Sequence, residues 1–219
     1  MDSALSAKSS RDYHLAELAV ARSRDDHRRS VPDIPEGSER VLDIGCGAGQ
    51  TLMACDLKGA QPHGIELDLD AIRLGQNLSL GIHFACGGGE LLPYRDASFD
   101  MVWSRVVMPY MHIPTAISEA ARVLRVGGHI WLTLHALSMF SLRRALHNHR
   151  TAVFEAYRLL NTVTLHLCGR QFRYPLRRSV IESYQTEFGI SRVLLRHGFE
   201  DLRMSKKDSQ FLVQARKRR

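Results

Sequence analysis

The 219-residue sequence has no long apolar run and few cysteines. No segment approaches the roughly 20 apolar residues of a membrane-spanning helix, and the opening MDSALSAKSSRDYH lacks the apolar core of a secretory signal. The four cysteines stand singly, without a CxxC pair, and the eleven histidines include no HExxH or other paired ligand spacing. These absences predict a cytoplasmic protein with reduced thiols, no membrane span and no bound metal.

Acidic residues are scarce in one stretch. The net charge is +7, and between Ser141 and Val180 eight arginines accompany a single acid, Glu155. The closing ARKRR adds four positive charges. Such a tract raises the local concentration of anionic partners, although a solvated basic surface explains it equally well.

Short apolar segments alternate with helical ones through most of the chain. RVLDIG, PHGIELD, HFAC, SFDMVWSRVVM and GGHIWLTLHA read as strands, and GQTLMACDLKG, LDAIRLGQNLSLG and IPTAISEAARVL read as the helices between them. This alternation is typical of an α/β fold with a doubly wound, mostly parallel sheet. SRVLLRHG predicts a last helix, and FEDLRMS with SQFLVQARK a closing antiparallel hairpin.

The flanking segments suggest one domain with helical additions. We expect an N-terminal helical cap over residues 1–38, with its helix at 10–29, and a ligand-binding core over 39–135. An insert over 136–188, mainly helical, would form a lid, and 189–219 would hold the last helix and hairpin. The insert helix TAVFEAYRLLNTVTLHL carries an apolar stripe that either lines a pocket or packs in the core: Phe154, Tyr157, Leu160 and Leu167.

The stretch VLDIGCGAGQ places three glycines where a strand turns into a helix, at Gly45, Gly47 and Gly49. Glycine admits positive φ there and lets a ligand lie against the main chain. A dinucleotide fingerprint would need glycine where Gln50 stands, and a phosphate loop would need a following lysine that is absent. The acid that precedes the glycines, Asp43, suits a ligand with an ammonium group and would repel a pyrophosphate.

VLDIGCGAG resembles the first motif of class I S-adenosylmethionine-dependent methyltransferases, in their small-molecule, methyltransferase type 11-like branch. GIELD, ELLPYRDASFDMVWS and EAARVLRVGGHIWLT resemble three later segments in order, and LLRHGFEDL with FLVQARK resembles the family's end. The resemblance implies a Rossmann-like seven-stranded sheet and S-adenosylmethionine as cofactor. The residues it implies for cofactor binding are Asp43, Gly45, Cys46, Gly47, Gly49, Glu66, Leu67, Gly89, Glu90, Leu91 and Ser104.

Three of these positions carry particular expectations. Glu66, at the end of the second strand, would accept hydrogen bonds from the ribose hydroxyls. Cys46 lies in the glycine turn, where its small side chain would pack. The acid that usually meets the adenine amino group is replaced by Gly88, so adenine recognition would rest on backbone near Gly89 and on Glu90.

Candidate catalytic residues follow the fourth and fifth strands: Tyr110, His112 and His135. Any of them could orient or deprotonate a methyl acceptor, or simply pack. The family's [DN]PP[YFW] and Pro-Cys motifs for nucleic-acid bases are absent.

The leading hypothesis is therefore methyl transfer to a small molecule, which the basic tract would favour as anionic or carrier-bound. An RNA methyltransferase that uses the basic insert and a non-catalytic binding subunit stay open as alternatives. The sequence is compatible with a monomer or a homodimer.

Overall fold

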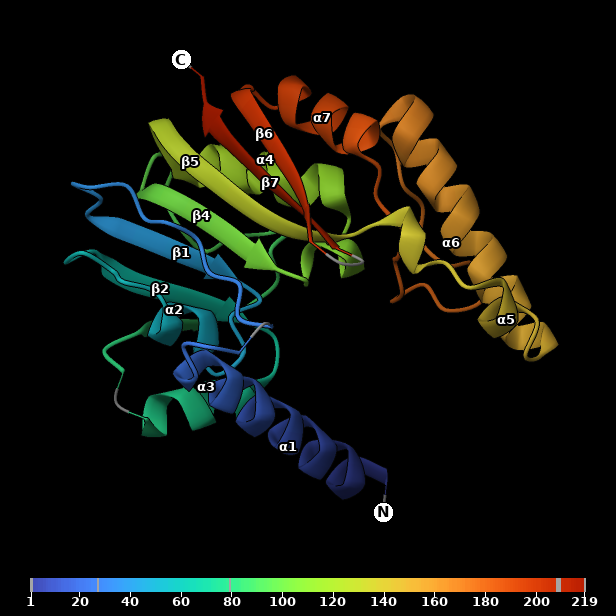
Figure 1. Cartoon of the computed structure of the whole chain (residues 1–219), viewed down its shortest axis with the longest axis horizontal. Helices are drawn as coiled ribbons and strands as arrows, with labels where there is room; N and C mark the ends of the chain where they lie inside the picture. The colour runs from blue at the N-terminus through green and yellow to red at the C-terminus, as the bar shows by residue number, and fades with distance from the viewer. Residues whose placement is uncertain (1, 27, 79, 208–209, 219) are drawn as a thin grey trace.

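The structure is a computed structural model that describes residues 2–26, 28–78, 80–207 and 210–218. Seven strands form one sheet in the order β3-β2-β1-β4-β5-β7-β6 (Figure 1). Only β7 runs antiparallel to its neighbours. The strands are β1 (Arg40–Ile44), β2 (Gln61–Glu66), β3 (His83–Cys86), β4 (Phe99–Arg105), β5 (Leu124–His135), β6 (Phe199–Lys207) and β7 (Gln210–Lys217). The predicted α/β class, the mostly parallel sheet and the closing hairpin are confirmed.

The helices enter in the alternating order that the sequence predicts. They are α1 (Asp2–Arg22), α2 (Gln50–Ala54), α3 (Leu69–Asn77), α4 (Ile113–Val123), α5 (Leu142–Ala145), α6 (His149–Cys168) and α7 (Glu187–Arg196), with 3₁₀ turns η1 (Met108–Tyr110) and η2 (Leu137–Met139). Among the described residues, none of these helices is both long enough and apolar enough to cross a bilayer.

Each face of the sheet has its own apolar core, because the strands alternate their side chains. On one face, Leu42 and Ile44 pack with residues of α4 and α7. On the other, Val41 packs with Leu52 of α2 and with Trp103. The carboxyl ends of the parallel strands emerge between these two layers, so their loops gather at one edge.

Two sequence predictions about the flanks were wrong in extent. The first helix ends at Arg22 rather than at residue 29, because Asp26 uses its side chain to cap a turn at the backbone N–H of Arg28. The insert is helical only to Cys168. Gly169 ends α6 with φ of 66°, and residues 169–186 return without a helix.

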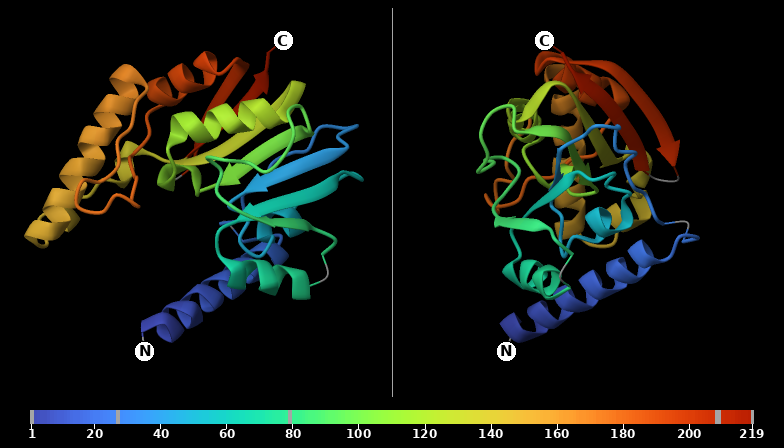
Figure 2. Two further views of the ribbon diagram at one scale, coloured as in Figure 1. Left: turned by 180° about the vertical axis from the view of Figure 1, so that it is seen from behind. Right: turned by 90° about the vertical axis from the view of Figure 1, so that its left-hand side faces the viewer.

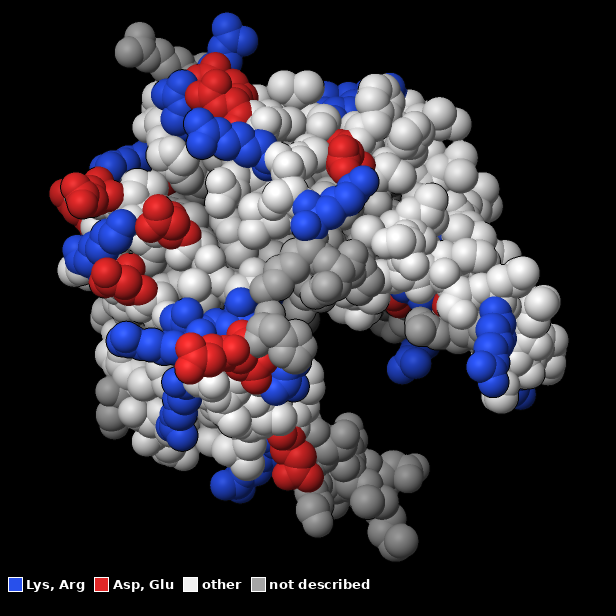
Figure 3. All heavy atoms as spheres, in the orientation of Figure 1, with Lys and Arg blue, Asp and Glu red and all other residues white. Residues whose placement is uncertain are grey.

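The arm formed by α5 and α6 extends away from the sheet, as the left view in Figure 2 shows, whereas α1 packs against α2 and α3. Figure 3 shows the surface hollowed between the core and this arm. In Figure 1, β1, β2 and β4 point their arrowheads toward that hollow. Ligands of open α/β sheets collect at this edge.

Candidate functional site

The glycine turn after β1 has the backbone that the sequence predicts. Gly45, Gly47 and Gly49 adopt φ of 75°, 56° and 83°. A Cβ on Gly45 would lie 2.6 Å from Val107 Cγ1, and one on Gly49 would lie 2.5 Å from Ile82 Cδ1. Only glycine fits both the conformation and the space.

Glu66 faces this turn from the end of β2. Its Oε2 accepts the Gly47 N–H at 2.9 Å, and its Oε1 accepts the N–H groups of Leu67 at 2.7 Å and Asp68 at 3.0 Å. A carboxylate has about four acceptor sites, so one remains for a ligand hydroxyl. The sequence did not predict these three hydrogen bonds from the backbone, which hold the Glu66 carboxylate in place without a ligand.

Unpartnered polar atoms gather beside the turn. Asp43 is buried, and neither of its carboxylate oxygens has a hydrogen-bond partner among the described residues. Burial raises its pKa to about 7, with Trp103 and Arg105 acting in the opposite direction. Gln50 Oε1 is similarly buried without a partner. Such orphaned groups are uncommon in interiors, and a nearby cationic ligand would stabilise the Asp43 carboxylate.

The helix α1 covers the glycine turn, which the sequence did not indicate. His14 is buried, and its Cε1 lies 2.9 Å from where a Cβ of Gly47 would be. Ser10 Oγ donates to Asp68 Oδ2 at 2.5 Å. The sequence predicts an apolar stripe along this helix through Leu15, Leu18, Ala19 and Ala21. Leu18 is buried as predicted, but Leu15 is about half exposed and His14 takes an inner position. The register of a mostly polar helix is not legible from its sequence.

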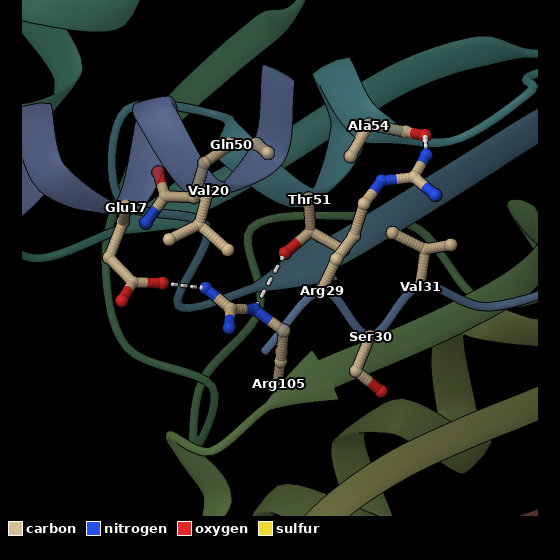
Figure 4. A pocket seen from close by; sticks show the side chains of 10 residues that line it. Glu17, Val20, Arg29, Ser30, Val31, Gln50, Thr51, Ala54 and Arg105 are labelled. Atoms are coloured by element: carbon tan, nitrogen blue, oxygen red, sulfur yellow. Dashed lines mark hydrogen bonds and ion pairs between the residues drawn. The ribbon is translucent and has the colours of Figure 1, made fainter. Parts of the chain in front are cut away.

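Arg105 ties α1 to the end of β4 (Figure 4). Its guanidinium forms an ion pair with Glu17 and donates from Nε to Thr51 Oγ1 at 3.2 Å. The cavity between these elements is only about 10 Å³, which is room for about one water molecule. It belongs to the packing of α1 and is too small for a cofactor.

Other predicted cofactor residues fall into different environments. The Cys46 thiol packs in the core, 2.5 Å from where a Cβ of Gly64 would lie, so it faces away from the turn's surface. Leu67 and Leu91 are exposed. A Cβ on Gly89 would collide with Ile44, at 2.5 Å. Glu90 is committed through Oε1 to the His112 N–H at 2.6 Å, and a Cβ on Gly88 would meet nothing within 4 Å.

The carboxyl ends of β4 and β5 bring two of the three candidate catalytic residues together. The rings of Tyr110 and His135 lie edge to face, with centroids 5.4 Å apart. His112 instead caps α4, with Nδ1 2.6 Å from Thr115 Oγ1. Ser104 is fully buried, and its Oγ has no partner in the described part of the chain.

The peptide that follows β4 is held in an unusual conformation. Val106 has φ of 57°, which is rare for a β-branched residue. Its N–H donates to Thr133 Oγ1 at 2.8 Å, and this bond fixes it to β5. Strained residues of this kind cluster at functional sites.

His135 is itself buried, and its Nδ1 has no hydrogen-bond partner among the described residues. Burial lowers the pKa of its imidazole, and the nearby Arg158 lowers it further. Arg158 is in turn buried and paired with Glu155 at 2.8 Å and with Glu182 at 2.7 Å. One arginine of the predicted basic surface is therefore an interior residue, and His135 is held neutral near pH 7.

Residues 42–132 match the family described as "Methyltransferase domain". The malonyl-[acyl-carrier protein] O-methyltransferase of Pseudescherichia vulneris is 32% identical over 107 residues, 48% of this chain and 43% of the relative. The phthiotriol/phenolphthiotriol dimycocerosates methyltransferase of Mycobacterium leprae is 31% identical over 109 residues, 48% of this chain and 40% of the relative. The chain thus spans less than half the length of these curated relatives.

The fold has close counterparts among solved structures. A SAM-dependent methyltransferase structure from Methanosarcina mazei is 20% identical, with a TM-score of 0.57, and the match covers 84% of this chain and 94% of that one. This likeness extends to the flanks that the family match leaves out.

Proposed function

We propose that this chain, whose residues 42–132 match the methyltransferase domain family, is a class I S-adenosylmethionine-dependent enzyme that transfers a methyl group to a small-molecule acceptor. The cofactor of this family is S-adenosylmethionine, as the resemblance of the glycine motif implied. The observation that carries the proposal is the glycine turn with the Glu66 carboxylate held 2.9 Å from the Gly47 nitrogen.

The residues around the glycine turn fit that cofactor. Glu66 retains an acceptor site for a ribose hydroxyl, and the glycines leave the main chain accessible. A cationic ligand would lower the raised pKa of the buried Asp43 and hold its carboxylate ionised, and that carboxylate would in turn favour the ligand's positive charge. We assign cofactor binding to these residues, with Gly89 shaping the adenine side. Cys46 would contribute only through its backbone.

When bound, the cofactor supplies a methyl group on a sulfonium, which already carries its activation. The protein's task is therefore to place the acceptor and exclude water. His135 is neutral and has a free Nδ1, so it can take a proton from an acceptor. Tyr110, at the edge of His135, would orient that acceptor from the open side.

The hollow and the basic tract support the proposed acceptor class. The exposed Arg173, Arg177 and Arg178 lie in the segment that returns from α6 to the sheet. One curated relative is named for a carrier-bound malonyl group, which supports an anionic or carrier-bound acceptor here. The insert would close over that acceptor as a lid.

A labelling experiment tests the function. The protein is incubated with S-adenosylmethionine carrying a radioactive methyl group and with fractionated metabolites, carrier-bound acyl groups or RNA. We expect label in a small-molecule or carrier-bound fraction, and none with the Glu66→Ala variant. Label in RNA would instead support the alternative substrate, and label in no fraction would contradict methyl transfer.

A further inference from the structure

The outer face of α6 is an exposed apolar stripe. Val153, Leu160, Val163 and Leu167 are 49%, 55%, 49% and 58% exposed, and Ala156 between them is also exposed. The steps between these residues are three, four, three and four, which keeps them in line along one side of a helix. The sequence left open whether the stripe of Phe154, Tyr157, Leu160 and Leu167 lines a pocket or packs in the core. Tyr157 is buried, whereas Leu160 and Leu167 are more than half exposed and do not pack in the core.

The stripe faces away from the candidate site. The side of α6 that packs on the protein carries Glu155, Arg158, Asn161 and Leu165, all buried. Because the stripe lies on the opposite side of the helix, it cannot line the acceptor site. Soluble monomers seldom expose a continuous aliphatic surface without a use for it.

We propose that this stripe pairs with the same stripe of a second copy of this chain, the two α6 helices running antiparallel. Val153 and Leu167 lie seven residues on either side of Leu160, so a two-fold axis there places Val153 against the partner's Leu167. Ala156 and the partner's Val163 then lie within one residue, about 1.5 Å along the helix axis, of facing each other. An isologous contact of this kind closes as a dimer. The inference rests on the fold and not on the proposed methyl transfer.

Charge supports a helix as the occupant. The positions that flank the stripe are Ala152, Leu159, Thr164 and His166, with no Lys, Arg, Asp or Glu among them. A helix that lies on an anionic membrane needs a strongly basic face beside its apolar one. In α6 the charged side chains either point inward or, like Arg150, stand at the end. The visible surface of the arm in Figure 3 is mostly uncharged, with basic side chains at its lower end.

The size of the contact sets its strength. A helix of 20 residues is about 30 Å long and about 10 Å wide, so the stripe offers about 300 Å², whereas a standard interface buries about 800 Å² per partner. Antiparallel pairing would extend it, because exposed leucines beside the start of α6, Leu142 of α5 and Leu146 just after it, would approach the partner's Phe188, which lies against His166 with ring centroids 4.9 Å apart. We therefore expect a dimer with a micromolar dissociation constant.

Sedimentation velocity over a range of protein concentrations tests the pairing. The unaltered chain should shift from monomer to dimer, and Leu160→Glu should weaken association at least tenfold without a change in its circular dichroism. Leu176→Glu, at an exposed leucine outside α6, is the matched control and should still dimerise. A chain that stays monomeric at several hundred micromolar, or a dimer that Leu160→Glu leaves intact, overturns the proposal.

The salt dependence of association distinguishes pairing with a second copy from binding to an acidic partner. Pairing brings Arg150 near the partner's Arg170, so like charges meet at both ends, and added salt should tighten the dimer by screening them. An interface between acidic and basic surfaces would weaken under the same change. Association that weakens steeply with salt therefore counts against this contact.

Cross-linking tests the direction of the helices. In a background with the exposed Cys86 and Cys168 changed to serine, Leu160→Cys should be joined by a short bis-maleimide. Val153→Cys should not, because 14 residues of helix place the two thiols about 21 Å apart along an antiparallel pair. Cross-linking of Val153→Cys as efficient as that of Leu160→Cys would show a parallel pair and refute the proposed geometry.

Discussion

The rings of Tyr110 and His135 meet edge to face at the carboxyl end of the sheet, with centroids 5.4 Å apart and planes at 87°. The tyrosine is about half exposed, whereas the histidine is buried. This pair joins the loop after β4 to the last residue of β5. In the proposed function, this pair is where an acceptor would meet a titratable group.

The lowered pKa of His135 makes a pH prediction. Burial favours the neutral imidazole in the folded protein, so its pKa lies below the ordinary value of 6.5. If His135 accepts the acceptor's proton, kcat/KM should rise with pH through that lowered pKa and then level off. In His135→Asn this pH-dependent rise should be absent, and kcat/KM should fall about 10²- to 10⁴-fold.

Tyr110→Phe is the control, because it keeps the ring contact with His135 and should keep the rise of kcat/KM with pH. The lowered pKa of His135 also affects folding, because the unfolded chain binds a proton at this imidazole more readily than the folded protein does. The contribution of neutral His135 to the free energy of unfolding is therefore complete above pH 6.5 and is lost as pH falls through the folded pKa. An acidic limb of kcat/KM that persists in His135→Asn would exclude the imidazole as the base.

A carboxylate at position 88 should raise the affinity for the cofactor. A side chain there meets no atom within 4 Å, and the residue does not need positive φ. Gly88→Asp should restore the carboxylate that the family uses for the adenine amino group and tighten cofactor binding about fivefold, or ~1 kcal/mol. Calorimetry with S-adenosylhomocysteine measures this, with Gly88→Ala as control. Equal affinity in the two variants would mean that adenine lies elsewhere.

The buried Arg158 predicts a large loss of stability. Arg158→Met would leave the buried Glu155 and the partly buried Glu182 without their cation, which costs about 3–5 kcal/mol. Thermal unfolding should show this loss, whereas Arg150→Met, at an exposed position in the first turn of α6, should change stability by less than about 0.5 kcal/mol. Similar melting temperatures for both variants would contradict the buried network.

The exposed arginines after α6 predict a salt effect on acceptor use. Alanine at Arg173, Arg177 and Arg178 together should raise KM for an anionic acceptor about tenfold at low salt, and less at high salt. Alanine at Arg203, Lys206 and Arg218, exposed residues in or just after the closing hairpin, removes the same charge and should have little effect. A KM that the first triple variant leaves unchanged would reject an anionic acceptor held there.

The sequence was sufficient for the sheet because its signals are local. The glycines after β1 and the apolar runs of β4 and β5 fix the turn and the strands without reference to the rest of the chain. Arg158 carries no such signal, since a charged residue in an arginine-rich tract reads as surface. Its burial depends on Glu182, 24 residues later, and so on the path of the insert.

The site was predictable to a similar extent. Position at the end of a parallel strand placed Glu66 and His135 at one edge. The contact of His14 with the glycine turn depends on how α1 lies across the sheet, and no local pattern encodes that. The exposed side of α6 was misassigned because an apolar stripe looks the same whether its partner is the core or another chain.

The proposed binding of the cofactor at the glycine turn is tested most directly by calorimetry with S-adenosylhomocysteine. The unaltered protein should bind it at micromolar concentrations, and Glu66→Ala should weaken binding at least tenfold, or ~1.4 kcal/mol, while Asp70→Ala, at an exposed acid of the next helix, should not. Absence of binding to the unaltered protein at high micromolar concentrations, or equal affinity in Glu66→Ala, would contradict the account.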